Sequence, residues 1–426
     1  MSRRVVVTGL GVVTPLGDDL ETVWRAWLDG TPGTASSRRF AAQRPPARSV
    51  GEVPDATIDR LRAEFGADAA TTDLRTLFAV AAARRAVAHA ALPAAALARA
   101  GAAVASGPGA HRLEDFVAAA DEDGRVELAR LAAGPAAVHG GSLWRNPPDR
   151  PATEVARRLG LGGPVSTVTT ACAASLQAIG SALRAMRAGK ADVMLAGGAD
   201  AMGDPFGLVF FVLLGAAATE EGATACRPFS RRRTGMVTGE GAAVAVLETE
   251  EHARARGATP LCEVAGYGAS FDAFRVTAPH PEGRGAAQAM AKALADGALD
   301  PSEVDYVSAH ATGTKLNDPA EAKAIRTVFG PHASRVAVSS GKAAMGHLLA
   351  AAGAVSFASA VLSVARDVVP PTINLAPAEV DPACALDHVL GAARRTPVRA
   401  ALVNGLAFGG HNATIALRKA PGGTAS

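Results

Sequence analysis

The sequence contains few cysteines and few aromatic side chains. Its 426 residues include four cysteines, at 172, 226, 262 and 384, and no CxxC pair. This spacing argues against a zinc site or a disulfide framework, and it predicts a protein kept reduced in the cytoplasm. Aromatic residues make up only 4%. Small side chains must therefore fill much of the core, which suits a layered α/β protein, although codon bias explains the composition equally well.

Long apolar runs and a strong charge excess are also absent. No stretch of about 18 apolar residues and no secretory signal can be found, so we expect no membrane span. The longest apolar segment, PFGLVFFVLLGAAA at 205–218, is too short to span and is expected to be buried. The formal net charge of +3 gives no reason to expect nucleic-acid binding.

Strand-like and helix-like segments alternate along the chain, which favours α/β layers. The expected strands are 5–13, 191–200, 304–310 and 335–340, the segment 242–257 is expected to pass from strand to helix, and the expected helices are 74–92, 286–299 and 319–330. The segment 101–150 is rich in Gly, Pro and charge, and breaks this alternation. We expect irregular structure there, covering a site or a dimer contact.

Two parts of the chain resemble each other. VSTVTT, at 165–170, leads through a cysteine into an alanine-rich helical segment, and VAVSS, at 336–340, leads through a turn into another. Both place a turn between a strand and a helix, where chemistry is often located. We interpret this similarity as a weak sign of a duplicated fold.

Cys172 begins the first of these helical segments. A free cysteine is most often a buried structural residue. At a helix N-terminus, however, the unpaired N–H groups and the dipole stabilise a thiolate, the reactive form. From position alone, a nucleophile and a core residue are about equally favoured. The other three cysteines lack this setting and are assigned to structure.

Two of the ten histidines lie in unusual surroundings. His310 ends a predicted strand and opens the polar loop HATGTKLNDP, and His347 follows a glycine in GKAAMGHLLAAAG. Either alone would more often be structural. Together with a cysteine at a strand end, they indicate acyl chemistry at a thioester. The glycines of FGGHN, after Phe408, predict a tight bend that can direct a backbone N–H at an oxyanion, although a simple turn explains them equally.

These strings, taken together, resemble the elongating β-ketoacyl-acyl carrier protein synthases of the thiolase superfamily. The resemblance runs nearly end to end and rests on RRVVVTGLGVVTPLG, TACAAS, ADVMLAGGADA, RPFSRRRTGMVTGEGAA, GYGASFDAFRVTAPHPEG, DYVSAHATGTKLNDPAEAKAI, GKAAMGHLLAAAG and FGGHN. It implies a thiolase-like, five-layered αβαβα fold of two duplicated halves. Residues 1–255 would carry the cysteine, and 256–426 the two histidines.

The resemblance also implies roles for individual residues. Cys172 would accept the acyl chain, and His310 and His347 would support decarboxylation of malonyl-carrier protein. Lys342 would pair with Glu321 and position the loop of the second histidine. The remaining implied roles are contact with the pantetheine arm for Thr312 and Thr314, and a gate for Phe408, whose N–H would form the oxyanion hole with that of Cys172.

The implied reaction is a decarboxylative Claisen condensation in fatty acid or polyketide biosynthesis, with no cofactor and no metal. A Cys-His-His set separates the elongating enzymes from chain-initiating synthases, which use Cys-His-Asn, and from thiolases, which use a second cysteine. The implied partners are acyl carrier protein and a second subunit, either a copy of this chain or a chain-length-factor-like relative. Two alternatives stay open: a non-catalytic subunit, and a non-decarboxylating thiolase or acyltransferase.

Several positions depart from the family pattern near the implied site. Ala311 and Ala350 stand where glycine is usual, and an alanine at 311 would be strained if that residue needs a positive φ. Leu406 stands where a phenylalanine is usual, which predicts a wider or softer entrance to the acyl pocket.

Other departures concern docking of the carrier protein. Ser230 replaces a usual aspartate, and Gly215 stands where some relatives have a carrier-contacting arginine. The basic run 231–233 could meet an acidic carrier, although a solvated loop is favoured about two to one. Together these departures suggest a specialised pathway, with this chain as the ketosynthase of a type II polyketide system.

Overall fold

The computed structural model describes residues 3–39, 47–109, 121–123, 125, 129, 147–202 and 205–420. Most of the segment 101–150, predicted to cover a site or a dimer contact, lies outside the described residues. Its first part is not irregular, because Gly101–Ser106 forms the buried strand β4.

Eleven strands form the main sheet, in two groups with the same order of pairing. The first group is, in spatial order, β5 (Val165–Val168), β4, β6 (Val193–Asp200), β8 (Gly241–Thr249) and β1 (Val5–Val13). The second is β11 (Ala337–Ser339), β10 (Tyr306–Ser308), β15 (Ala400–Leu406), β16 (His411–Arg418) and β9 (Cys262–Phe271), with β13 (Asp387–His388) beside β11. In each group two parallel pairings are followed by two antiparallel ones. The groups meet where β1 pairs briefly with β9.

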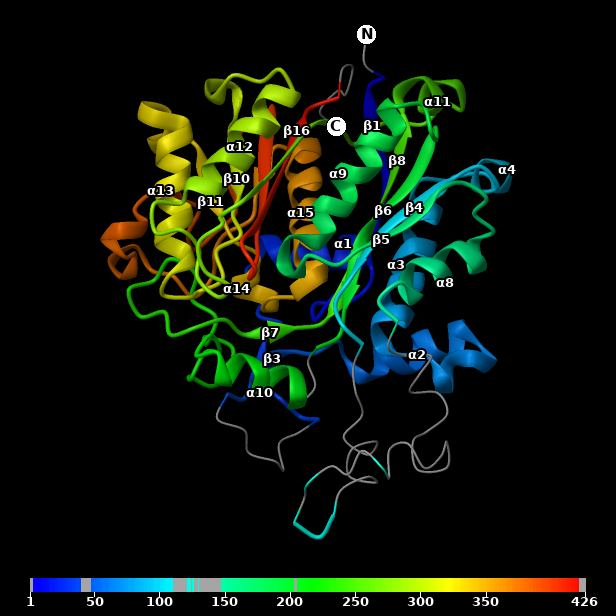
Figure 1. Ribbon diagram of the computed structural model, residues 1–426. Coiled ribbons are helices and arrows are strands. Elements are labelled where there is room, and N and C mark those ends of the chain that lie inside the picture. The colour runs from blue at the N-terminus through cyan, green and yellow to red at the C-terminus, as the bar shows by residue number, and fades with distance from the viewer. Residues whose placement is uncertain are drawn as a thin grey trace.

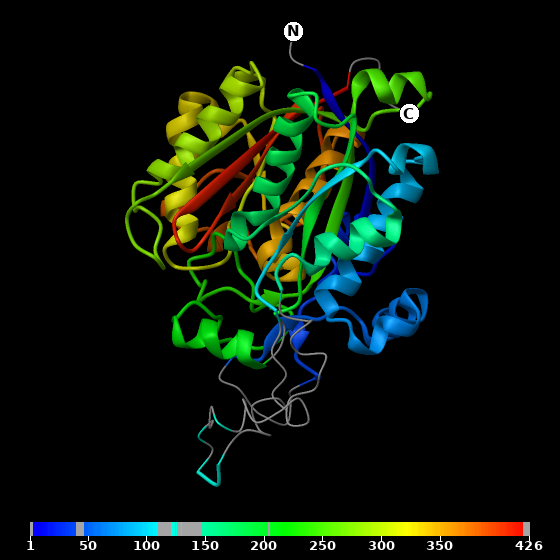
Figure 2. The ribbon, with the colours of Figure 1, turned by 45° about the vertical axis from the view of Figure 1, so that its right-hand side comes forward.

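Helices cover both outer faces of this sheet and fill the space between its two groups (Figures 1 and 2). The three helical layers are α3 (Leu74–His89) with α8 (Arg150–Leu159), α9 (Ala174–Arg187) with α15 (Ala352–Arg366), and α12 (Arg284–Asp296) with α13 (Asn317–Phe329). The result is the five-layered αβαβα arrangement predicted from the sequence, with its two related halves. The assignment of 1–255 and 256–426 to separate domains stays a prediction.

Short elements complete the described parts of the chain. The helices are α1 (Leu20–Leu28), α2 (Asp55–Phe65), α4 (Ala94–Leu97), α10 (Pro205–Leu213), α11 (Glu250–Ala255) and α14 (Lys342–Met345). The strands are β2 (Ala35–Ser36), β3 (Ser49–Gly51), β7 (Thr238–Gly239), β12 (Val368–Val369) and β14 (Arg394–Arg395). Single 3-10 turns lie at η2 (Ala67–Thr71), η3 (Ala171–Ala173), η4 (Pro301–Glu303), η5 (Gly330–Ser334), η6 (Leu349–Ala351), η7 (Pro377–Glu379) and η8 (Pro382–Cys384).

Small residues allow the two central helices to pack closely. A Cβ at Gly353 of α15 would lie 2.7 Å from the side chain of Leu176 in α9, so only glycine permits this approach. The segment Leu349–Arg366 is long and apolar enough to cross a membrane, yet 83% of it is buried within the structure. Its apolar character is therefore accounted for by its position in the middle layer.

The expectation that the whole of 205–218 is buried is wrong. Leu208 and Phe211 of α10 are buried, but Phe210 is 52% exposed and Leu213 is 81% exposed. One face of the helix packs on the cluster that contains Met236, and the face with Phe210 and Leu213 is exposed. A uniformly apolar sequence carries no periodicity that distinguishes these two faces.

Candidate active site

Cys172 lies at the predicted turn between strand and helix. β5 ends at Val168, the 3-10 turn η3 contains the cysteine, and α9 begins at Ala174. Ala171 has a φ of 48°, an unusual value for a residue with a Cβ, and it turns the chain into the helix. The cysteine is only 6% exposed. The turn thus places the buried thiol at the N-terminal end of α9, in the middle helical layer.

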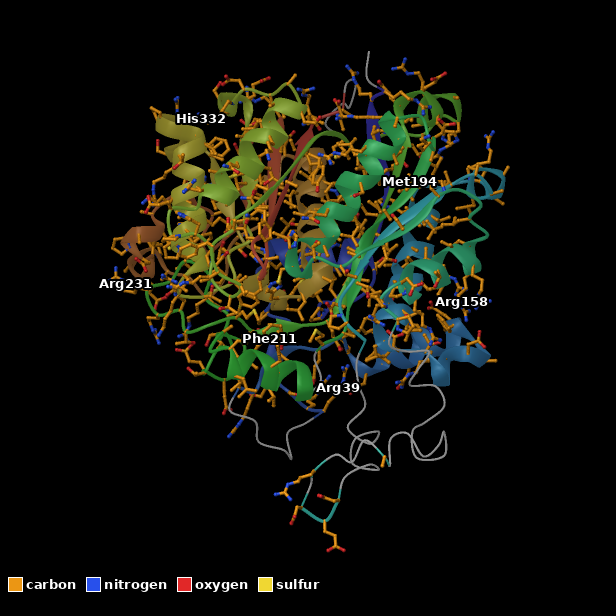
Figure 3. All side chains as sticks on the ribbon, in the orientation of Figure 1. Arg39, Arg158, Met194, Phe211, Arg231 and His332 are labelled. Carbon is orange, nitrogen blue, oxygen red and sulfur yellow. The ribbon has the colours of Figure 1, made fainter. Side chains whose placement is uncertain are left out.

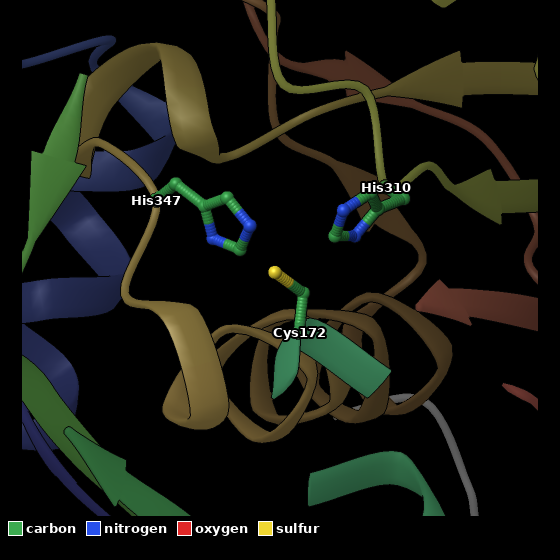
Figure 4. Close-up of side chains that lie close together, drawn as sticks. All are labelled: Cys172, His310 and His347. Carbon is green, nitrogen blue, oxygen red and sulfur yellow. The ribbon is translucent and has the colours of Figure 1, made fainter. Parts of the chain in front are cut away.

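The structure brings both histidines to this thiol. His310 follows β10, and His347 lies between α14 and η6. The thiol sulfur and one ring nitrogen of each histidine all lie within 4.8 Å of one another, and the three side chains point toward a common space (Figure 4). The two rings are edge-to-face, with centroids 5.1 Å apart. Cys172 and His310, which are 138 positions apart in the sequence, therefore face one small substrate group together with His347.

The ring of His347 is oriented by a backbone group. Its Nδ1 accepts a hydrogen bond from the N–H of Leu349 at 3.1 Å, so the neutral ring carries its proton on Nε2. Nε2 is buried and has no partner among the described residues. Burial, together with Lys342, lowers the pKa of His347 well below its ordinary value. The residue is thus a neutral hydrogen-bond donor directed into the site.

His310 is positioned through its backbone. Its N–H and that of Ala311 donate to the two oxygens of Glu321, each at 2.7 Å. The side-chain amide of Asn404 donates a third hydrogen bond to the Glu321 carboxylate, at 3.1 Å. Burial, followed by the positive charge of Lys342, lowers the pKa of His310 well below its ordinary value. Both imidazoles are therefore neutral near pH 7.

The structure shows no direct hydrogen bond between Lys342 and Glu321, so their expected pairing stays a prediction and is supported only by the attraction of their charges. Both Glu321 oxygens are occupied by the donors just described, and the buried Lys342 Nζ makes no hydrogen bond to any described residue. Burial lowers the pKa of Lys342, and the nearby charge of Glu321 opposes that shift. Lys342 acts on Glu321 only through space. Its unpaired ammonium also lies near enough to lower the pKa of Cys172.

The thiolate that a helix N-terminus predicts at Cys172 is not favoured in the structure. Burial raises the pKa of this thiol to about 12, and this effect outweighs the attraction of Lys342. The buried carboxylate Asp200 raises the pKa further. Burial disfavours the charged thiolate, so the thiol stays protonated near pH 7.

Two backbone N–H groups are directed at the sulfur. The backbone N–H groups of Phe408 and of Cys172 itself both act to lower the pKa of the thiol. The bend predicted after Phe408 is present, because Gly409 and Gly410 have φ values of 85° and 84°. A pair of N–H groups converging at a nucleophile is the arrangement that stabilises an oxyanion.

A pocket of about 490 Å³ leads from the surface to these groups. Its lining includes Cys172, both histidines, Phe408, and the two threonines expected to contact pantetheine. The hydroxyls of Thr312 and Thr314 lie 3.0 Å apart. Both threonines thus line the pocket through which a pantetheine arm would have to reach the Cys172 thiol.

This wall of the pocket is positioned by Asp318, which the sequence did not single out, and by Arg233 of the basic run. Asp318 is buried, and its carboxylate accepts the backbone N–H groups of Thr312, Gly313 and Phe229. Arg233 donates to the carbonyl of Thr314 at 3.0 Å. An aspartate in the first turn of a helix, after a polar loop, is the signal that could have identified Asp318.

The departures from the family pattern have local explanations. Ala311 is not among the described residues with a positive φ, so alanine is not strained there. The positive φ of this loop, 78°, falls on Gly313. Ala350 follows Leu349, whose φ is 49°, and donates its N–H to Asp200 at 3.0 Å. Leu406 lines the pocket and packs in the C-terminal core, so its effect on the entrance stays a prediction.

The basic run 231–233 does not form a single surface patch. Arg233 is buried and donates to Asp381 at 2.6 Å, whereas Arg231 and Arg232 are exposed. Arg232 is paired with Glu379 at 2.9 Å, and Arg231 lies on the outside of the C-terminal half (Figure 3). Ser230 is fully buried beside them. Gly215 has a φ of 64°, and a Cβ built there would meet no described atom within 4 Å.

The same three side chains could also hold a metal ion. A thiolate and two imidazoles at this spacing form a donor set that zinc accepts. Binding would require loss of the thiol proton, which burial opposes. The expectation of a metal-free site stays a prediction.

Profiles of two adjoining domains match the chain. The β-ketoacyl synthase N-terminal domain matches residues 2–253, and the C-terminal domain of the same family matches 261–376. Among curated proteins, a 3-oxoacyl-[acyl-carrier-protein] synthase 2 of Synechocystis is 38% identical over 98% of both chains. A nodulation protein E of a Rhizobium species is 41% identical over 98% of this chain and all of the other.

Solved structures give the same result. The ishigamide ketosynthase/chain length factor superimposes with a TM-score of 0.87 at 35% identity, covering 99% of this chain and all of the other. A type II polyketide acyl-carrier protein in complex with its ketosynthase, bound to the hexaketide, gives a TM-score of 0.86 at 31% identity, again over 99% and 100%.

Proposed function

The chain belongs to the β-ketoacyl synthase family, and on that premise we propose that Cys172, His310 and His347 carry out a decarboxylative condensation. The observation that carries this proposal is the convergence of one thiol and two neutral imidazoles within 4.8 Å. The thiol would carry the acyl chain, and the imidazoles would stabilise the enolate of the extender unit.

The first step is transfer of the acyl group to Cys172. Its sulfur attacks the carbonyl of an acyl thioester on the carrier arm, and the oxyanion accepts the N–H groups of Cys172 and Phe408. The bond from the carbonyl carbon to the arm sulfur then breaks, and that sulfur leaves as a thiol with the proton that Cys172 loses. No net charge is left in the buried site, which suits a thiol whose pKa is raised.

The second step consumes a malonyl thioester. Its carbon–carboxylate bond breaks, CO₂ leaves, and the electron pair stays as an enolate whose oxygen accepts N–H bonds from His310 and His347. The enolate carbon attacks the acyl-Cys172 carbonyl, the carbon–sulfur bond breaks, and the sulfur takes a proton from solvent. Neutral imidazoles suit this role, because an uncharged ring can donate its N–H to the enolate oxygen, and burial keeps both rings uncharged.

The test is acylation followed by condensation. The protein is incubated with a panel of acyl-carrier proteins, and mass spectrometry locates the acyl group. Malonyl-carrier protein is then added, and CO₂ and the β-ketoacyl product are measured. Acyl-Cys172 followed by malonyl-dependent CO₂ release supports the proposal. Release of a product without CO₂ would instead indicate a thiolase or acyltransferase.

The partners follow from the same chemistry. Substrates enter on the arm of an acyl carrier protein, as the solved complex of a related ketosynthase with its acyl-carrier protein suggests. The second subunit would be a copy of this chain or a chain-length-factor-like relative, and the pathway would be a type II polyketide or fatty acid pathway. The reaction takes place in the cytoplasm, where the four cysteines, all free in the structure, stay reduced.

A non-catalytic, chain-length-factor-like role is the second candidate. The intact site counts against it, because a subunit that only shapes a pocket needs no buried thiol between two oriented imidazoles. Formation of the β-ketoacyl product that survives Cys172→Ala would favour this role. Metal analysis of the purified protein tests the accompanying proposal that no metal and no cofactor is needed.

A further inference from the structure

We propose that Arg275 and Lys315 bind the phosphate of the carrier arm at the mouth of the active-site pocket. This inference rests on the proposed function, because it names the part of that substrate which lies farthest from the reacting thioester. It assigns a phosphate subsite to two side chains that the sequence did not single out.

The two cations come from different segments and line the same pocket. Arg275 lies between β9 and α12, and Lys315 lies between β10 and the first residue of α13. Both are exposed, and neither forms an ion pair with a carboxylate among the described residues. Exposed Arg232, outside the pocket, shows the contrast, because it is paired with Glu379. Two unpaired cations over one pocket attract an anion.

The pocket contains little negative charge to compete with such an anion. Asp272 carries the one carboxylate among the described lining residues. Its Oδ1 accepts the side-chain amide of Asn412 at 2.9 Å, and its Oδ2 accepts the N–H of His280 at 3.2 Å. Both oxygens are therefore engaged in holding their own segment together.

Hydrogen bonds fix the backbone near each cation. The carbonyl of Val276, next to Arg275, accepts the N–H of Gly409 at 2.6 Å. The carbonyl of Lys315 accepts from the buried Arg233 at 3.3 Å. The two side chains thus extend from anchored segments, which reduces the entropy lost when they close on a ligand.

The chemistry of the arm matches this arrangement. An arm with its thioester at Cys172 passes Thr312 and Thr314, and its phosphate end must remain near the mouth, where Arg275 and Lys315 lie. A guanidinium can bind two phosphate oxygens at once, and an ammonium adds a compact charge. A hydrogen bond to a charged group contributes about 1.5–3 kcal/mol, so a preference for phosphorylated donors of about tenfold or more is expected.

The experiment compares two small donors that differ only in the phosphate. Hexanoyl-phosphopantetheine and hexanoyl-pantetheine are offered to the full-length protein, and the rate of Cys172 acylation is measured by mass spectrometry at low salt. We expect the phosphorylated donor to react at least about tenfold faster, and this ratio to fall as salt screens the charges. Acylation of Cys172 by both donors at equal rates would overturn the phosphate subsite and leave the proposed function intact. No acylation by either donor or by acyl-carrier protein would instead contradict the proposed function.

Variants assign the preference to the two residues. Arg275→Gln and Lys315→Gln should each reduce the ratio, and the double variant should bring it close to one, while the rate with hexanoyl-pantetheine stays unchanged. Arg335→Gln is the matched control, because Arg335 is exposed and precedes β11, outside the pocket lining. A double variant that keeps the full ratio overturns the assignment. So does a variant that slows transfer from acyl-carrier protein but leaves both small donors unaffected, since the cations would then contact the carrier's surface.

Discussion

Ala171 and Leu349 have the same backbone conformation at equivalent places in the two halves. Their φ values are 48° and 49°, and each is the first residue of a three-residue 3-10 turn that leads directly into a central helix. The equivalence aligns Cys172 with Ala350. One turn therefore carries the thiol, and its counterpart carries a methyl group and donates a backbone N–H to Asp200.

The same substitution should have opposite effects at two alanines of the site. Ala171→Gly removes a Cβ from a residue with positive φ and should raise the free energy of unfolding by about 0.5–1 kcal/mol. Ala311→Gly adds flexibility at a buried residue without positive φ, and should lower it by about 0.5–1 kcal/mol. Urea unfolding of the two variants measures both changes. If Ala311→Gly were stabilising, the strain first expected at that position would exist after all.

The two chemical steps should separate by mutation. Cys172→Ala should abolish the acyl-enzyme, while malonyl-dependent CO₂ release continues because both imidazoles remain. His347→Ala removes the Nε2 donor and should slow CO₂ release by about 10²–10³-fold, with a smaller effect on Cys172 acylation. His332→Ala serves as the control, because His332 lies in η5, outside the pocket lining. Equal losses of both steps in His347→Ala would mean that this histidine does not act mainly on the enolate.

Alkylation of Cys172 should show no plateau at ordinary pH. A pKa of about 12 leaves the thiol protonated, so the thiolate fraction, and with it the rate with iodoacetamide, rises about tenfold per pH unit through pH 9. The urea-unfolded chain should instead level off above about pH 8.5. Mass spectrometry of the Cys172 peptide measures both profiles. A plateau near pH 7 in the folded protein would show a stabilised thiolate and contradict this expectation.

Lys342→Met should stabilise the fold of the protein and slow acylation of Cys172. The ammonium is buried without a hydrogen-bond partner among the described residues, so its replacement by an apolar side chain of similar length should raise the free energy of unfolding by about 1–3 kcal/mol. Acylation should slow, because a charge that lowers the Cys172 pKa is lost. Lys323→Met, at an exposed ion pair with Glu282, should change stability by less than about 0.5 kcal/mol. A loss of stability in Lys342→Met would mean that the ammonium has a stabilising partner.

The sequence by itself predicted α/β layers, and through its family resemblance it implied the αβαβα arrangement and pointed to Cys172, His310 and His347. Strand and helix periodicity is local, and the strings around these residues are specific enough to resemble one family. The convergence of Cys172, His310 and His347 follows from the duplicated order of strands, which brings the turn after β5 and the loop after β10 to the centre of the molecule.

Only the tertiary structure decided the charges and the partners. Burial sets the protonation of Cys172, and the competition of backbone N–H groups for Glu321 leaves Lys342 without a hydrogen bond to that carboxylate. The exposed face of α10 and the two cations at the pocket mouth depend likewise on which layers lie next to them. Such properties depend on groups distant in sequence, because solvation and hydrogen bonding are set by everything that surrounds an atom, and a local pattern records only its neighbours along the chain.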